Sequence, residues 1–154
     1  MTAETDMMKL YSGRILALAA ELPRAGRLEA PDGTARKRSP LCGSTVTVDV
    51  ATDGDRVRDY AQDVKACALG QAAASVVGAA VVGLDRATIQ RGRDELYAML
   101  KDGGPVPQAP FADLEVLEPA RDYKNRHASI LLAFDATLAA LDDATGQTEK
   151  TAAR

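Results

Sequence analysis

The stretch that decides the fold is "TVTVDVATDGDRVRDYAQDV", residues 45–64. Val46, Val48 and Val50 alternate with polar residues, which is the pattern of a strand with one buried face. The pair Asp53-Gly54 favours the positive φ of a tight turn, and a second strand-like run follows it. The stretch therefore predicts a β-hairpin whose two antiparallel strands are joined through residues 52–54.

Helical patterns dominate the rest of the chain. We expect an amphipathic helix over Asp6–Leu22, then a loop over residues 23–41 with one short strand near Leu28. After the hairpin, the sequence predicts a buried Ala/Ser/Gly-rich helix from Cys67 to Gly83 and a helix over Asp85–Lys101 with an Asp cap. A Gly/Pro loop over 103–110 and a helical turn or two over 111–123, broken at Pro119, should follow. A last helix is expected from about Lys124 to Leu141, and it buries one face formed by Ile130, Leu131, Phe134, Leu138 and Leu141.

This order of elements predicts an α+β fold, in which helices cover one face of a small antiparallel sheet of two to three strands. The chain has 154 residues, of which 46% are hydrophobic, so it fits one domain with its own core. We assign that domain to residues 1–143 and expect a disordered tail over 144–154.

Composition narrows the function classes. A formal charge of -3 gives no support for nucleic-acid binding. The densest basic cluster, residues 36–38, falls in the predicted loop and indicates a solvated turn or a protein-docking patch. No secretory signal or membrane span is visible, so we expect a cytoplasmic protein. No Ser/His/Asp order, nucleotide loop or paired-carboxylate signature stands out, so we expect no enzyme.

The two cysteines fall at the outer ends of the predicted hairpin. Cys42 precedes its first strand and Cys67 follows its second, so antiparallel pairing brings the two thiols close together. Cys67 also begins a helix, where the helix dipole favours a thiolate. Two such thiols form either a metal- or sulfur-handling site or a pair of half-buried structural cysteines, and their spacing leaves both interpretations open.

Several motifs together resemble the iron–sulfur cluster scaffold family of IscU, SufU and the NifU N-terminal domain. They are the turn Pro40-Leu41-Cys42-Gly43, the hairpin Asp53-Gly54-Asp55-Arg56-Val57, the helix start Cys67-Ala68 with Ala72 to Ser75, and the closing-helix stretch "YKNRHASILLAFDA". The resemblance covers roughly residues 5–142 and implies an IscU-like fold and a cysteine desulfurase as partner. The segment "GGPVPQAPFADLEVLEPARDY" is similar to an insertion of the SufU-like branch, and the Leu-Pro-Pro-Val-Lys chaperone motif of IscU is absent.

The resemblance also implies a set of ligands, three cysteines and one aspartate. Cys42 and Cys67 match two of the cysteines, and Gly43 would let the backbone approach a bound metal closely. Ser44 stands at the aspartate position and Ser129 at the third cysteine, with Arg126 at the basic position just upstream. Serine is a poor substitute, because its hydroxyl ionises far less readily than a thiol.

His127, the only histidine, is a further candidate ligand, although a polar residue at the start of the last helix is the more common role.

A protein with this incomplete ligand set could still function in three ways. Two subunits of a homodimer could pool Cys42 and Cys67 around one bridging cluster, or the thiols could accept persulfide sulfur without holding a cluster. In the third way, the chain only binds and modulates a desulfurase.

The sequence therefore carries two hypotheses. In the first, the protein assembles iron–sulfur clusters as a scaffold or sulfur acceptor through Cys42 and Cys67, with a transient cluster or zinc as the bound species. In the second, it is a cluster-free protein-interaction module that docks a desulfurase through Arg126 and the basic residues 36–38.

Overall fold

The computed structural model describes residues 12–40 and 43–146. Along the chain the elements are α2 (Gly13–Glu21), β1 (Gly33–Arg38), β2 (Thr45–Asp53), β3 (Arg56–Lys65), α3 (Ala68–Ala80), α4 (Arg86–Lys101), the 3₁₀ segments η1 (Ala112–Asp122) and η2 (Lys124–Arg126), and α5 (His127–Ala144).

The predicted hairpin is confirmed. β2 and β3 pair antiparallel, from Thr45 opposite Lys65 at the open end to Asp53 opposite Arg56 at the turn. Gly54 takes a φ of +64°, a conformation that glycine adopts without strain. The two outer ends of the hairpin therefore meet at one edge of the molecule, as the sequence predicts.

The third strand does not lie near Leu28, where the sequence predicted one. It is β1, which begins five residues after Leu28. β1 pairs with the edge of β2 that does not face β3, so the strand order is β1-β2-β3. Leu28 instead donates its backbone N–H to the side chain of Asp49. The basic residues 36–38 consequently belong to an edge strand and not to a loop, and all three are exposed.

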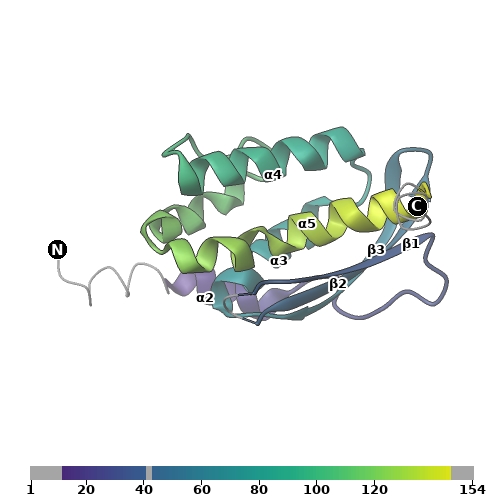
Figure 1. Cartoon of the computed structure of the whole chain (residues 1–154), viewed down its shortest axis with the longest axis horizontal. Helices are drawn as coiled ribbons and strands as arrows, with labels where there is room; N and C mark the ends of the chain where they lie inside the picture. The colour runs from purple at the N-terminus through teal and green to yellow at the C-terminus, as the bar shows by residue number, and fades with distance from the viewer. Residues whose placement is uncertain (1–11, 41–42, 147–154) are drawn as a thin grey trace.

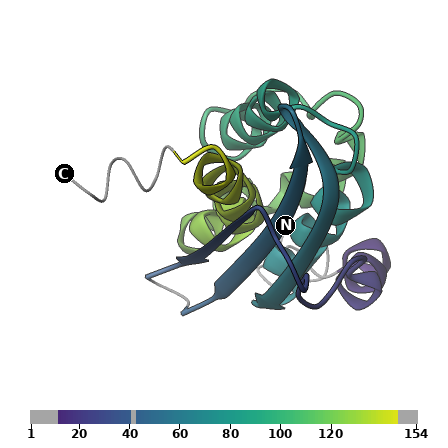
Figure 2. The same cartoon turned by 90° about the vertical axis from the view of Figure 1, so that its right-hand side faces the viewer.

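The helices form layers on the sheet, which confirms the predicted α+β class (Figure 1). α3 and α5 pack directly on the sheet, with α5 against β1 and β2 and α3 against β3. α4 then covers α5 from the side away from the strands, while η1 packs against α4 and α3; Figure 2 shows α4 and the sheet from the end of the molecule. The core lies between the valines of β2 and the two inner helices.

The inner helices are buried on more than one side. In α3 nine residues from Leu69 to Gly78 are buried, as its small side chains predict. In α5 the five predicted core residues are buried, and so are seven more. The single buried face predicted for this helix is therefore too narrow, because α5 lies between the sheet and α4.

Several helical boundaries differ from the prediction, and α3 ends at Ala80, three residues before the predicted stop at Gly83. η1 continues through Pro119 instead of breaking there, since the missing proline N–H removes one hydrogen bond while Leu117 and Ala120 on either side stay fully buried. α5 begins at His127, after the 3₁₀ turn η2, and ends at Ala144. α4 follows its prediction closely, with the Asp85 carboxylate accepting from Thr88 N–H at 2.8 Å.

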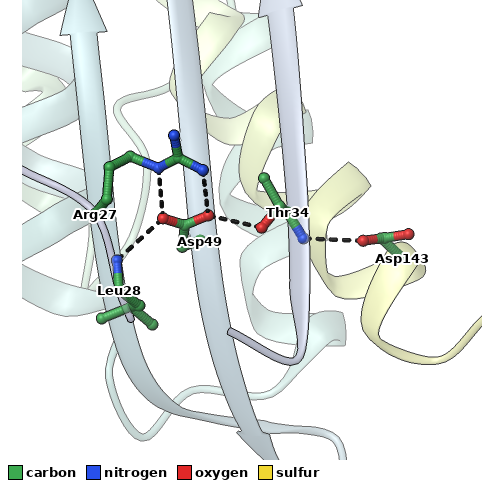
Figure 3. Close-up of polar contacts among 5 residues, drawn as sticks. All are labelled: Arg27, Leu28, Thr34, Asp49 and Asp143. Atoms are coloured by element: carbon green, nitrogen blue, oxygen red, sulfur yellow. Dashed lines mark hydrogen bonds and ion pairs between the residues drawn. The ribbon is translucent and has the colours of Figure 1, made fainter. Parts of the chain in front are cut away.

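On the face of the sheet that points away from the helices, the carboxylate of Asp49 is buried and fully hydrogen-bonded (Figure 3). It accepts from Arg27 Nε at 2.6 Å, Thr34 Oγ1 at 2.6 Å and Leu28 N–H at 3.0 Å. Burial by itself raises the pKa of Asp49, but these hydrogen bonds outweigh it and hold the pKa below its ordinary value. Asp49 therefore joins the α2–β1 connection to the middle of the sheet.

The first described helix, α2, begins at Gly13 with Ser12 as its N-cap. The predicted start at Asp6 lies outside the described residues. Ser75 of α3 fixes the end of α2, because its hydroxyl accepts from Leu22 N–H and donates to the Leu18 carbonyl. None of the helices in the described residues is long and apolar enough to cross a membrane.

Candidate functional site

The short loop between β1 and β2 contains the first predicted ligand positions, Cys42, Gly43 and Ser44. Its base is closed by two backbone hydrogen bonds, from Ser39 N–H to the Ser44 carbonyl at 2.8 Å and from Gly43 N–H to the Ser39 carbonyl at 2.9 Å. Gly43 is exposed and has a φ of +70°, which a side chain would strain. Cys42 itself lies outside the described residues.

Three predicted positions come together at the open end of the hairpin. Ser129 Oγ of α5 donates to Ser44 Oγ at 3.0 Å, and it lies 3.8 Å from Cys67 Sγ. Ser44 and Ser129 are buried, whereas Cys67 is half-buried. Cys67 is also the N-cap residue of α3, as predicted, and it makes no side-chain capping bond. The thiol is thus positioned by the helix start and contacted by one hydroxyl.

A glycine lets α3 and α5 approach closely at this point. A Cβ atom added to Gly70 would lie 2.8 Å from Ser129 Oγ and 3.1 Å from the Ser129 carbonyl oxygen. Real Cβ atoms rarely tolerate such distances, so Gly70 sets the position of Ser129 beside Cys67. Gly70 was not among the predicted site residues, and its only signal in the sequence is a Cys-x-x-Gly spacing at the start of a helix.

The donor set is unusual for a metal or cluster. Two hydroxyls and one thiol occupy the described positions, and no group of three or more His, Cys, Asp and Glu side chains gathers around a possible ion in residues 12–40 and 43–146. Hydroxyls are weak ligands for soft metals. Among the described positions, the thiol of Cys67 is therefore the best ligand for a soft metal.

His127 lies near this site in sequence but is held elsewhere. Its Nε2 lies 2.9 Å from the carbonyl oxygen of Ala120 in η1, and the ring is buried. Burial lowers the pKa of His127, and the nearby Lys101 and Lys124 lower it further. None of the contacts described for His127 reaches Cys67 or Ser129, so this histidine is held by a structural contact, the more common role named above.

A groove of about 470 Å³ begins beside Ser39 and runs between β1 and the helices α4 and α5. Its walls carry Lys37 and Arg38 from β1 and Arg93 and Lys101 from α4. Its floor is formed by apolar residues of α5, among them Leu131 and Leu132. The basic residues 36–38 were predicted as a surface cluster, but the groove was not predicted, because β1 does not lie where the sequence placed a strand.

Comparison with known proteins identifies the family of this chain and structures with the same fold. Residues 10–130 match the family described as the NifU-like N terminal domain. The crystal structure of a nitrogen-fixing NifU-like protein (N-terminal) from Brucella abortus is 46% identical, covers 94% of this chain and 99% of its own, and superposes with a TM-score of 0.87. No curated protein matches the chain significantly.

Two further structures share the fold at lower identity. A putative iron–sulfur cluster assembly scaffold protein for the SUF system from Fervidobacterium islandicum AW-1 is 20% identical, with a TM-score of 0.77 over 87% of this chain and 98% of its own. A hypothetical protein is 21% identical, with a TM-score of 0.74 over 83% and 96%.

The match over residues 10–130 and the 46% identical structure together define the family of this chain. The chain belongs to the NifU-like N-terminal domain family, within the IscU, SufU and NifU group of cluster-assembly scaffolds that its motifs resemble.

Proposed function

We propose that this protein takes part in iron–sulfur cluster assembly and that Cys42 and Cys67 are its working thiols. The observation that carries the proposal is the meeting of Ser44, Cys67 and Ser129 at the end of the hairpin. These are three of the positions that hold ligands in the family it resembles. The SUF-system relative, described as a putative scaffold, supports the same assignment through its fold.

Sulfur acceptance is the step that the described residues support best. The Cys67 thiolate attacks the outer sulfur of a persulfide on a cysteine desulfurase; the donor S–S bond breaks and the donor cysteine leaves as a thiolate. Cys67 becomes the new persulfide, so one sulfur atom moves and no electrons are exchanged with a third group. Because its hydroxyl donates to Ser44 Oγ, Ser129 is placed to accept from the Cys67 thiol, whose Sγ lies 3.8 Å from Ser129 Oγ.

Cluster binding needs more ligands than one subunit supplies. Four thiolates are the usual set for an iron–sulfur cluster, and one chain has two cysteines. A homodimer that brings both cysteine pairs together would complete the set around one bridging cluster, the cargo of the protein. Zinc bound at the same thiols is the other candidate species.

The test combines sulfur transfer with reconstitution. Protein treated with a persulfide-loaded desulfurase is expected to gain one sulfur atom by intact mass, and Cys67→Ser is expected to lose that gain. Anaerobic iron and sulfide are expected to give a visible charge-transfer band that Cys42→Ser abolishes. Thr145→Ala, at an exposed position, serves as the matched control and should keep both signals.

A second candidate function follows from the hydrogen bond between the two serines. Because Ser44 and Ser129 satisfy each other, the site is stable without an ion, as expected for a cluster-free module that only docks a desulfurase. Arg126 and the basic residues 36–38 would then form the docking surface. Desulfurase binding without sulfur gain and without a visible band would favour this second function over the first.

A further inference from the structure

A separate cavity of about 260 Å³ lies where four elements meet. It is lined by Leu100 and Lys101 from the end of α4, Arg121 from η1, Lys124 from η2 and His127 from the start of α5. None of the site positions Ser44, Cys67 and Ser129 lines it. The cavity is therefore distinct from the thiol site.

One buried lining group, His127, lacks a hydrogen-bond partner at one atom. The side chain of His127 is 1% exposed, and Nε2 lies 2.9 Å from the Ala120 carbonyl oxygen. A carbonyl only accepts, so Nε2 carries the proton and Nδ1 of the neutral ring is an acceptor. Across residues 12–40 and 43–146, Nδ1 has no hydrogen-bond partner, which is costly for a buried polar atom.

A second lining residue has a buried donor without a partner. Arg121 Nε is inaccessible and makes no hydrogen bond within the described residues, although Arg121 Nη2 lies 3.4 Å from the Gly104 carbonyl. Two lysines, Lys101 and Lys124, add positive charge to the same cavity. Glu118 Oε2 lies 4.0 Å from Arg121 Nη2, but none of the described residues that line the cavity is acidic, whereas three of them are Lys or Arg.

We propose that this cavity binds inorganic hydrogen phosphate. Its oxygens accept from Arg121 Nε and from the two lysine ammonium groups, and its P–OH group donates to His127 Nδ1. One small ion thereby satisfies both unpartnered atoms and balances the positive charge. Sulfate has the same shape and charge class but no hydroxyl at neutral pH, so it satisfies Arg121 and leaves His127 Nδ1 without a donor.

The test is calorimetric and NMR titration of the full chain at neutral pH. Inorganic phosphate is expected to shift the His127 and Arg121 resonances and to bind about ten-fold more tightly than sulfate. Arg121→Gln and Lys124→Gln are each expected to weaken phosphate binding about ten-fold. Lys124 is exposed, so its variant should fold normally. Lys37→Gln, in the neighbouring groove, is the matched control and should bind as the unchanged protein does.

Three results would overturn the proposal. The first is the absence of any resonance shift at His127 in tens of millimolar phosphate. The second is equal affinity for sulfate and phosphate, or equal loss in Lys37→Gln and Lys124→Gln, since either would indicate general attraction of anions. The third is tighter binding of O-phosphoserine than of inorganic phosphate, which would assign the cavity to phosphate esters.

Discussion

Ser129 Oγ of α5 donates a hydrogen bond to Ser44 Oγ at the start of β2, across 3.0 Å. These two hydroxyls occupy positions that carry a thiolate and a carboxylate in the family the chain resembles. Both hydroxyls are buried, and their mutual hydrogen bond offsets the free-energy cost of that burial without a metal ion. This pair, distant in sequence, thereby joins α5 to the start of β2 beside Cys67.

Replacing Ser129 with cysteine is expected to create a third thiol at the site. Ser129→Cys should raise the affinity for Zn²⁺ at least ten-fold, because a thiolate is a far better ligand for a soft metal than a hydroxyl. Competition with a chromophoric chelator measures the change. Ser12→Cys, at the N-cap of α2, adds a thiol away from the site and should leave the affinity unchanged. Equal gains in the two variants would argue against the assigned site.

Adding a methyl group at Gly70 is expected to separate α3 from α5. Its Cβ would lie 2.8 Å from Ser129 Oγ and 2.9 Å from the Ala66 side chain, so Gly70→Ala should lower the free energy of unfolding by roughly 2 kcal/mol. Urea denaturation measures the loss. Gly13→Ala, also in a helix but with open space around it, should leave stability unchanged or raise it. A neutral Gly70→Ala would mean that the helices adjust without cost.

Asp49 is expected to make stability depend on pH. Its folded pKa lies below the unfolded value, so its contribution is complete above the unfolded pKa and is lost as pH falls through the folded pKa. Asp49→Asn should cost about 2 kcal/mol at pH 7 and progressively less as the pH falls below about 4. Denaturation at several pH values tests this. Asp59→Asn, which removes an exposed pair with Arg24, should change stability by less than about 1 kcal/mol.

Ser75 is expected to hold α2 against α3. Ser75→Ala removes the hydroxyl that bonds both Leu22 N–H and the Leu18 carbonyl, so the end of α2 should open more often. Hydrogen exchange at the Leu22 amide should become at least ten-fold faster, while exchange in the β2–β3 ladder stays unchanged. Uniform acceleration throughout the chain would instead indicate global destabilisation.

Local patterns made the hairpin and the approximate positions of the described helices predictable. The alternating valines of β2 and the Asp53-Gly54 turn specify their structure through adjacent residues, and the Asp85 cap does the same for α4. β1 was misplaced because its sequence, Gly-Thr-Ala-Arg-Lys-Arg, has no alternating pattern. That strand forms through its pairing with β2 and the close approach of α5, and Thr34 N–H donates to Asp143 of α5 at 2.9 Å.

The candidate site was only partly predictable for the same reason. The hairpin geometry indicates that Cys67 lies near the loop before β2, and the resemblance adds Ser44 and Ser129. The hydrogen bond between the serines and the role of Gly70 depend on how α5 packs on α3, which no local pattern specifies. The polar atoms at Arg121 and His127 likewise become visible only when η1, α4 and α5 are placed together.

The loop before β2 is closed at its base by two backbone hydrogen bonds, just beyond Arg38 opposite Thr45, where the β1–β2 ladder ends. Because backbone atoms make both bonds, the strands end at the same place whichever side chains lie at 40–42. A loop that keeps Gly43 and these two backbone hydrogen bonds would therefore change the chemistry of the site without changing where the strands of the sheet end.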